Sequence, residues 1–145
     1  MRSIYVRLEE MRKLSTESKK VQKYTPKRVY LPLAVYRSTD VSPIVKVGDK
    51  VKIGDVVAYS EENFPIPATV SGEVIGFEER FDAFGDLVKC IVIENDFKDK
   101  WNKRKKENKN LLKLKKETLI AKIRDAGIVG MGGSGFPTYI KYNTD

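Results

Sequence analysis

The residues best suited to chemistry are the glycines near the C-terminal end of the sequence. Five of them fall between Gly127 and Gly135, and the tripeptide Phe-Pro-Thr follows directly. Because glycine has no Cβ, the backbone N–H groups of such a loop can approach an anion closely. The segment therefore predicts a cradle for a phosphate group or a dinucleotide, with a glycine-rich linker as the alternative.

A short helix is expected to follow this loop. It would begin near Phe136, because the proline after it suits the first turn of a helix. The helix N-terminus would add a partial positive charge, and Lys141 would lie about one turn inside. Gly130, Gly132 and Gly135 satisfy the pattern G-x-G-x-x-G. The context differs from a Rossmann fold, since a helical segment precedes the loop where that fold has a strand.

The composition excludes most other catalytic chemistry. The chain of 145 residues has one cysteine and no histidine. It therefore lacks an internal disulfide, a four-cysteine metal site and any histidine-based triad, and we expect no catalytic residue and no metal site. Cys90 lies among strand-forming residues and is expected to be a buried, small apolar side chain.

No apolar run approaches the ~20 residues that a membrane-spanning helix needs. The N-terminal residues also lack the apolar core of a secretion signal. We therefore expect no transmembrane segment and a cytoplasmic protein, either free or peripheral at the cytoplasmic face of the membrane.

The net charge of +8 is concentrated in two flanking segments. Residues 1–28 carry nine basic and three acidic side chains, and residues 98–125 carry twelve and four. The centre, residues 29–97, carries six basic and twelve acidic side chains. Such flanks either bind an acidic partner protein or a membrane complex, or are a mobile arm and the solvated face of a helix.

The second basic segment has the periodicity of an amphipathic helix. From about residue 108, Leu112, Leu119 and Ile123 recur at helical spacing, while the lysines mostly fall elsewhere. The basic run at residues 103–106 has one aromatic neighbour, Trp101, but no nucleic-acid-binding signature accompanies it. We expect no nucleic-acid partner.

The central segment has the pattern of a small antiparallel β module. Short β-branched runs predict strands at residues 29–33, 44–47, 56–59, 68–77, with a turn at 71–72, and 87–94. Two near-repeats, VKVGD at 45–49 and VKIGD at 51–55, each predict a tight turn at Gly-Asp.

The arrangement of these strands and turns resembles the hammerhead fold of biotinyl and lipoyl carrier domains. Such a carrier needs a lysine at the tip of a hairpin. No lysine lies between Lys52 and Lys89, so we expect neither biotin nor a lipoyl group on this chain.

A more specific resemblance covers residues 29–141. Residues 127–141 (GIVGMGGSGFPTYIK) closely resemble the glycine-rich loop of the RnfC family, a component of Rnf-type electron transport complexes. They are also similar to the flavin- and NADH-binding subunit of respiratory complex I. Residues 45–49, 68–72 (ATVSG) and 93–96 (IEND) resemble the barrel-sandwich region of the RnfC family, in the same order.

The resemblance implies an α+β fold that is mainly β. A basic arm (residues 1–28) would precede a barrel-sandwich hybrid, hammerhead-like module (29–97). A basic linker and amphipathic helix (98–126) would lead to the glycine-rich start of a truncated flavin- and NADH-binding domain (127–145).

The resemblance also implies a function for the full-length protein. Electrons would pass from NADH through FMN to iron–sulfur clusters that lie downstream of this chain, and then to a partner reductase or membrane complex. Similar proteins of this family serve soluble reductases such as proline reductase. We expect the chain to be the N-terminal part of such a protein and to be inactive alone. The alternative is a non-catalytic docking module that binds an acidic partner or a membrane complex through the basic flanks.

Specific residues carry the implied cofactor contacts, although this chain alone is expected to bind neither FMN nor NAD(H) tightly. Phe136 would stack on or wall the nicotinamide cofactor, and Lys141 would bind phosphate or ribityl oxygens. Met131 stands where the respiratory complex I protein has arginine. Backbone contacts to the flavin phosphate or the dinucleotide are implied for Gly130, Gly132, Gly133, Ser134 and Gly135.

Overall fold

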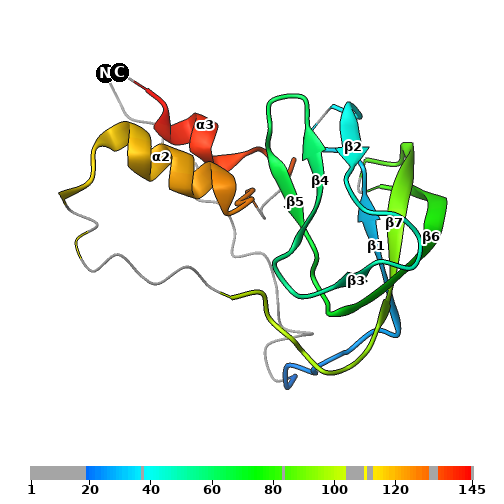
Figure 1. Ribbon diagram of the computed structural model, residues 1–145. Helices are drawn as coiled ribbons and strands as arrows, with labels where there is room; N and C mark the ends of the chain where they lie inside the picture. The colour runs from blue at the N-terminus through cyan, green and yellow to red at the C-terminus, as the bar shows by residue number, and fades with distance from the viewer. Residues whose placement is uncertain are drawn as a thin grey trace.

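Seven strands and two helices make up the part of the chain that the computed structural model describes (Figure 1). That part comprises residues 19–36, 38–82, 84–103, 110, 113–130 and 134–144. In chain order the elements are β1 (Arg28–Pro32), β2 (Val41–Pro43), β3 (Lys50–Val51), β4 (Val56–Ser60), β5 (Pro65–Pro67), β6 (Gly72–Phe81), β7 (Leu87–Asn95), α2 (Lys116–Asp125) and α3 (Thr138–Tyr142).

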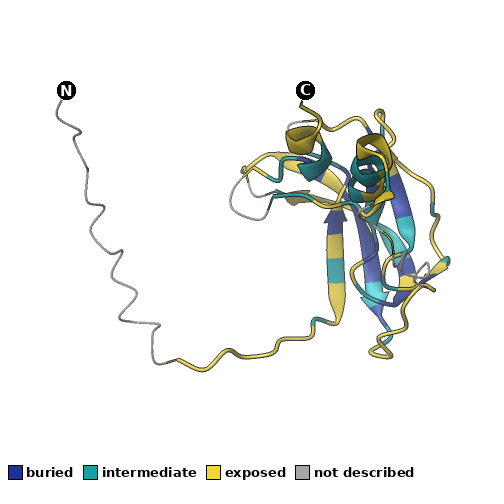
Figure 2. Ribbon diagram, turned by 90° about the vertical axis from the view of Figure 1, so that its left-hand side faces the viewer, coloured by how far each residue is buried: buried dark blue, intermediate teal, exposed yellow. Residues whose placement is uncertain are grey.

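The strands form two antiparallel sheets that share one core. The larger sheet has the order β1-β7-β6-β3, and the smaller one has the order β2-β4-β5. Buried side chains concentrate on these strands, whereas both helices lack fully buried residues (Figure 2). The core contains aliphatic residues of both sheets, among them Val57, Val74, Ile91 and Ile93. Burial of their apolar surface is the main driving force that holds the two sheets together.

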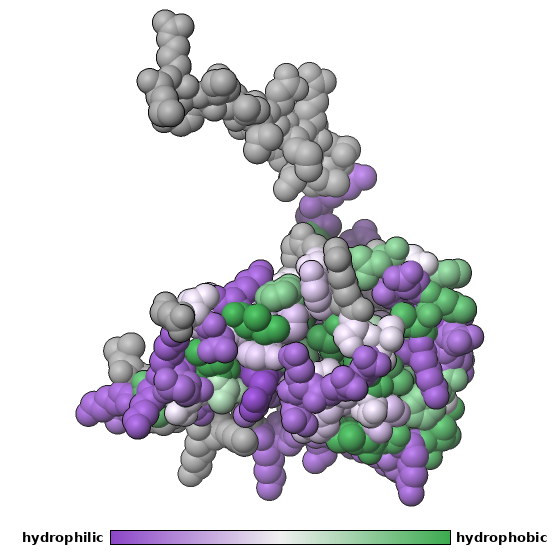
Figure 3. All heavy atoms as spheres, turned by 90° about the horizontal axis from the view of Figure 1, so that it is seen from above, coloured by the Kyte–Doolittle hydropathy of each residue, from purple (hydrophilic) through white to green (hydrophobic). Residues whose placement is uncertain are grey.

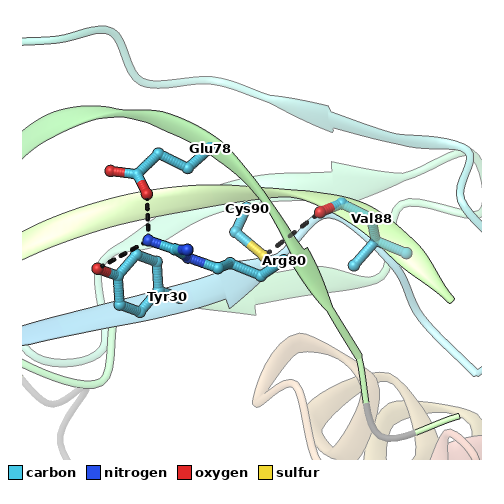
Figure 4. A network of polar contacts seen from close by, with 5 residues as sticks. All are labelled: Tyr30, Glu78, Arg80, Val88 and Cys90. Atoms are coloured by element: carbon cyan, nitrogen blue, oxygen red, sulfur yellow. Dashed lines mark hydrogen bonds and ion pairs between the residues drawn. The ribbon is translucent and has the colours of Figure 1, made fainter. Parts of the chain in front are cut away.

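Strand β7 is buried on both of its faces from Cys90 to Ile93. Ile91 and Ile93 belong to the shared core, while Cys90 lies on the opposite face of the strand and is 1% exposed. There the guanidinium of Arg80 lies 4.5 Å from the ring centroid of Tyr30 and also pairs with a glutamate of β6 (Figure 4). Burial raises the pKa of the Cys90 thiol. The prediction of a buried, small apolar cysteine is confirmed.

The two predicted Gly-Asp turns are confirmed in detail. Gly48 and Gly54 have φ angles of 92° and 86°, in the left-handed region that glycine tolerates best. In each turn the aspartate Oδ2 accepts a backbone N–H from three residues earlier, at 2.9 Å for Asp49 and 2.7 Å for Asp55. The repeated sequence therefore encodes a repeated turn.

Two predicted strands have wrong boundaries. Residues 44–47 are not a strand, because the chain there already bends into the first Gly-Asp turn, and β2 (Val41–Pro43) precedes them. The strand predicted from residue 68 begins at Gly72, since Ala68 hydrogen-bonds across to Asp55 and Gly54. The short strand β5 was not predicted, because its sequence Pro-Ile-Pro has few backbone donors.

Both helices begin later than the sequence predicted. The helix expected from about residue 108 begins at Lys116, and residues 104–109, 111 and 112 lie outside the described part of the chain. Leu119 and Ile123 are half-buried on α2, as their spacing predicted. The helix expected near Phe136 begins at Thr138, because residues 136–138 first pair with an earlier segment.

The two sheets together form the barrel. A buried serine anchors the chain after β7 to this barrel. The Ser71 side chain is 1% exposed. Its hydroxyl donates to Asp96 Oδ1 at 2.6 Å and accepts the backbone N–H of Lys100 at 3.0 Å. The Ser71 hydroxyl, with the backbone N–H of Lys98, lowers the pKa of Asp96. The start of the second basic segment is thereby fixed against the β module.

Gly72 lies close to the backbone of the neighbouring strand β7, and this close approach yields a stability prediction. A Cβ on Gly72 would lie 1.9 Å from the carbonyl oxygen of Glu94, whereas a Cβ on Gly76 of the same strand would meet no atom within 4 Å. Gly72→Ala is therefore expected to destabilise the fold by about 3 kcal/mol, because a backbone clash cannot relax as a side chain does. Gly76→Ala should change stability by no more than about 0.5 kcal/mol. Urea unfolding followed by circular dichroism measures both, and equal midpoints would contradict the assigned register of β6 and β7.

A second prediction concerns the acid stability that Asp96 provides. A carboxyl group whose pKa is lowered by folding stabilises the protein above its unfolded pKa of about 4, and this stability is lost as the pH falls. Ser71→Ala should cost about 1–2 kcal/mol at neutral pH, since Lys100 N–H loses its acceptor. The variant should also lose less stability than wild type on acidification. Urea unfolding at several pH values tests this, with Ser42→Ala on the exposed side of β2 as the control. If the free energy of unfolding fell equally with pH in wild type and Ser71→Ala, the role of Ser71 would be refuted.

Candidate nucleotide-binding site

The glycine-rich loop is closed at its base by two backbone hydrogen bonds. The N–H of Gly130 donates to the Phe136 carbonyl at 2.9 Å, and the N–H of Thr138 donates to the Ile128 carbonyl at 2.9 Å. Residues 131–133 lie outside the described part of the chain, so the predicted contacts of Gly132 and Gly133 stay predictions. The described ends, residues 128–130 and 136–138, form a narrow antiparallel pair.

Gly127 joins the end of α2 to the barrel. It has a φ of 64°, and its N–H donates to the Arg124 carbonyl at 2.8 Å, a common way for a glycine to end a helix. A Cβ at this position would lie 2.9 Å from the carbonyl oxygen of Pro65 in β5. This glycine therefore serves helix termination and close packing against β5.

Phe136 and Lys141 meet beside the base of the loop. The Lys141 Nζ lies 5.8 Å from the Phe136 ring centroid and 3.6 Å from the point where a Cβ on Gly130 would stand. The Phe136 ring also contacts Tyr36 edge to face, with the centroids 5.1 Å apart. Of the predicted cofactor-binding residues, the structure thus brings Gly130, Phe136 and Lys141 together.

Tyr139 of α3 contacts the hairpin between β4 and β5. Its ring stacks on Phe64 at 5.9 Å, and its hydroxyl donates to Glu62 Oε2 at 2.9 Å. Burial, and then the carboxylate of Glu62, raise the pKa of Tyr139. These contacts could not be predicted from the sequence, because the partners are 75 or more positions apart and no local pattern connects them.

Ser134 and Gly135 face a different hollow from Phe136. They line a cavity of about 420 Å³ between the loop and the barrel, with Asp82 and Phe84 from the β6–β7 connection. The remaining walls are mostly apolar side chains of residues 31–36 and 64–67. Cavities of this size and apolar character are typical of small-molecule sites.

The described loop residues fit a nucleotide. Gly135 has a φ of 65°, and a Cβ there would meet no atom within 4 Å, so open space adjoins this glycine. Lys141 supplies a positive charge beside Phe136 and is not among the residues that line this cavity. The cavity itself has an apolar lining suited to a ring system. The arrangement can hold a phosphate near the loop and a planar ring beside it.

The surface has a more hydrophobic and a more hydrophilic region (Figure 3). Seen from above, hydrophobic residues gather over the barrel and hydrophilic residues predominate around α2.

Neither helix is long and apolar enough to cross a membrane, as judged over the part of the chain that is described. Within the same residues, no cluster of three or more cysteines, aspartates and glutamates is placed to hold a metal ion.

The Tyr139–Glu62 contact gives a pH prediction. A phenol whose pKa is raised by folding stabilises the folded state below its unfolded pKa of about 10, and this contribution is lost as the pH rises further. Glu62→Gln should lower the pKa of Tyr139 relative to wild type, because a charged acceptor is removed. Burial should still keep the value above that of an exposed tyrosine. Carbon NMR of the Tyr139 ring during a pH titration measures the shift. Glu61→Gln, at the exposed neighbouring position, is the control, and equal titration curves for the two variants would contradict the contact.

Comparison with known proteins relates this architecture to a family. Residues 5–98 match a family model described as the RnfC barrel sandwich hybrid domain. The match confirms the predicted barrel-sandwich hybrid, mainly β architecture of the module.

Several curated proteins similar to this chain are described as the C component of an oxidoreductase complex. The chain is 37% identical over 118 residues to the C component of the Na(+)-translocating ferredoxin:NAD(+) oxidoreductase complex of Acetobacterium woodii. It is 37% identical over 119 residues to the C component of the proton-translocating ferredoxin:NAD(+) oxidoreductase complex of Clostridium ljungdahlii. These alignments cover 80% of this chain but 27% and 26% of the two relatives.

A third relative aligns over a shorter region. It is the C component of the ion-translocating oxidoreductase complex of Vibrio cholerae, which is 41% identical over 76 residues. These residues are 51% of this chain and 10% of that protein. The chain thus spans about a quarter of the length of the first two relatives.

Proposed function

Because the chain belongs to the RnfC family through its barrel-sandwich hybrid domain, we propose that it is the N-terminal part of an electron-transfer protein. In this proposal the whole protein passes electrons from NADH through FMN to iron–sulfur clusters and a partner reductase or membrane complex. The names of its relatives, which pair ferredoxin with NAD(+) in an oxidoreductase complex, support this class of reaction. In this proposal the protein is cytoplasmic, either free or peripheral at the cytoplasmic face of the membrane.

The observation that carries the proposal is the closed glycine loop with Phe136 and Lys141 at its base. Backbone N–H groups of Ser134 and Gly135 would contact a phosphate, together with those of Gly132 and Gly133, and Lys141 would neutralise part of its charge. The Phe136 ring would form one wall of the nicotinamide site. When bound, FMN supplies the conversion between two-electron hydride transfer and single-electron transfer.

The organisation of the chain follows from the same proposal. Residues 29–97 are the barrel-sandwich module, and residues 127–145 are the start of a flavin- and NADH-binding domain. Residues 98–126 connect them, and residues 1–28 are a basic arm. The loop packs on the barrel through Gly127 and Phe136, which supports treating the loop and the module as parts of one functional unit.

Docking through the basic flanks is the second candidate function. The described basic side chains of residues 113–124 are mostly exposed, which favours an acidic partner. Much of the flanking charge belongs to residues 1–18 and 104–109, which lie outside the described part of the chain. Docking and electron transfer are compatible, since a protein that works within a complex needs both.

Cofactor binding by the product of the complete reading frame that contains this chain tests the main proposal. We expect the purified product to bind FMN and NADH, measured by flavin fluorescence and by calorimetry. The chain of 145 residues by itself should bind both only weakly. Lys141→Gln should weaken FMN or NADH binding about tenfold, because one charge-assisted contact to phosphate is lost.

The matched control is Lys122→Gln, which removes an equally basic and exposed side chain from α2. This variant should bind both cofactors as wild type does. A wild-type product that binds neither FMN nor NADH would overturn the proposed function. If Lys141→Gln and Lys122→Gln lost affinity for FMN or NADH equally, net charge, and not the position of Lys141, would determine the affinity.

A further inference from the structure

We propose that the barrel positions the cofactor loop, with Tyr36 as the principal positioning residue for Phe136. This inference rests on the proposed function, because it assigns to the β module a role in the affinity of the nucleotide site. It concerns residues outside the glycine-rich segment, on two connections of the barrel. Tyr36 lies between β1 and β2, and Glu62 and Phe64 lie on the β4–β5 hairpin.

Tyr36 is held in an unusual conformation by its own turn. The backbones of Val35 and Ser38 exchange two hydrogen bonds, of 2.8 and 2.9 Å, and Tyr36 lies between them with a φ of 56°. A non-glycine residue with positive φ is strained and persists only where its surroundings impose it. The result of this strained turn is that the tyrosine ring meets the Phe136 ring at an interplanar angle of 83°. This edge-to-face geometry is the favourable one for two aromatic rings.

The β4–β5 hairpin holds the other side of the same segment. Its tip is closed by hydrogen bonds from the N–H groups of Asn63 and Phe64 to Ser60, at 2.9 Å to the carbonyl and 3.2 Å to the hydroxyl. The closed tip presents the Phe64 ring and the Glu62 carboxylate to Tyr139. The hairpin is therefore a preformed platform for α3.

These contacts bracket the residues that close the loop. Phe136 and Tyr139 lie on either side of the buried Pro137, and both of their rings pack on the barrel. The hydrogen bonds of Gly130 to Phe136 and of Thr138 to Ile128 lie within the bracketed segment. If the barrel loses its hold on Phe136, these two bonds should open more often, and the ring should no longer wall the nucleotide site.

Two readouts on tyrosine variants test this positioning role. In the chain of 145 residues, amide hydrogen exchange at Gly130 and Thr138 reports how often the base of the loop opens. Tyr36→Leu should increase the exchange rates of both amides about three- to tenfold, as expected for the loss of one aromatic pair. Tyr36→Phe, which keeps the ring, should accelerate this exchange less than Tyr36→Leu does. In the complete product, Tyr36→Leu should weaken NADH binding by a similar factor, and Tyr36→Phe should weaken it less.

The matched control is Tyr30→Leu, because Tyr30 and Tyr36 are both 37% exposed and Tyr30 packs on Arg80 of the outer barrel face. It should leave exchange at Gly130 and Thr138 unchanged. Unchanged exchange in Tyr36→Leu, or equal acceleration in Tyr30→Leu, would overturn the positioning role. If the wild-type product bound neither cofactor, the proposed function would fail, while the exchange rates would still decide whether the barrel positions the loop.

Discussion

Strand β7, which pairs with β1 on one side and β6 on the other, organises the core and the chain segments that flank it. Its inner face supplies Ile91 and Ile93 to the core, and its outer face is buried at Cys90. Where the strand ends, Asn95 donates to the Pro26 carbonyl at 3.0 Å and accepts the N–H of Phe97 at 2.8 Å. One strand therefore fixes the chain that enters the barrel and the chain that leaves it.

The barrel and the glycine-rich loop are coupled through side chains whose energies are individually small. An aromatic pair contributes about 1 kcal/mol, and the Tyr139–Glu62 hydrogen bond is exposed to solvent. Their effect on a binding site is larger than these energies suggest, since affinity depends on how well the site is preorganised. A module that resembles a swinging-arm carrier but lacks the carrier lysine can in this way act as a fixed support for a nucleotide loop.

Local chemistry explains which parts of the fold were predictable. The Gly-Asp turns were predicted correctly, because glycine conformation and the reach of an aspartate side chain are properties of a few adjacent residues. Cys90 was correctly predicted to be buried, because its neighbours are strand formers. The strand predicted at residues 44–47 was wrong, since the same valines also serve a turn. Strand β5 was missed, since its prolines oppose strand formation and only pairing with β4 imposes it.

The turns, the resemblance to the RnfC family and the chemical character of the loop follow from the amino-acid sequence alone. They depend on residue type and short spacing, and both are visible in a single chain. The contacts of Tyr36 with Phe136 and of the β4–β5 hairpin with Tyr139 arise only when the chain folds. The same holds for the packing of Gly127 against β5. These contacts join residues about 60 to 100 positions apart, and their partners are selected by how the two sheets pack. The shape of the site therefore depends on the barrel, although the residues that would bind the cofactor belong to the glycine-rich segment.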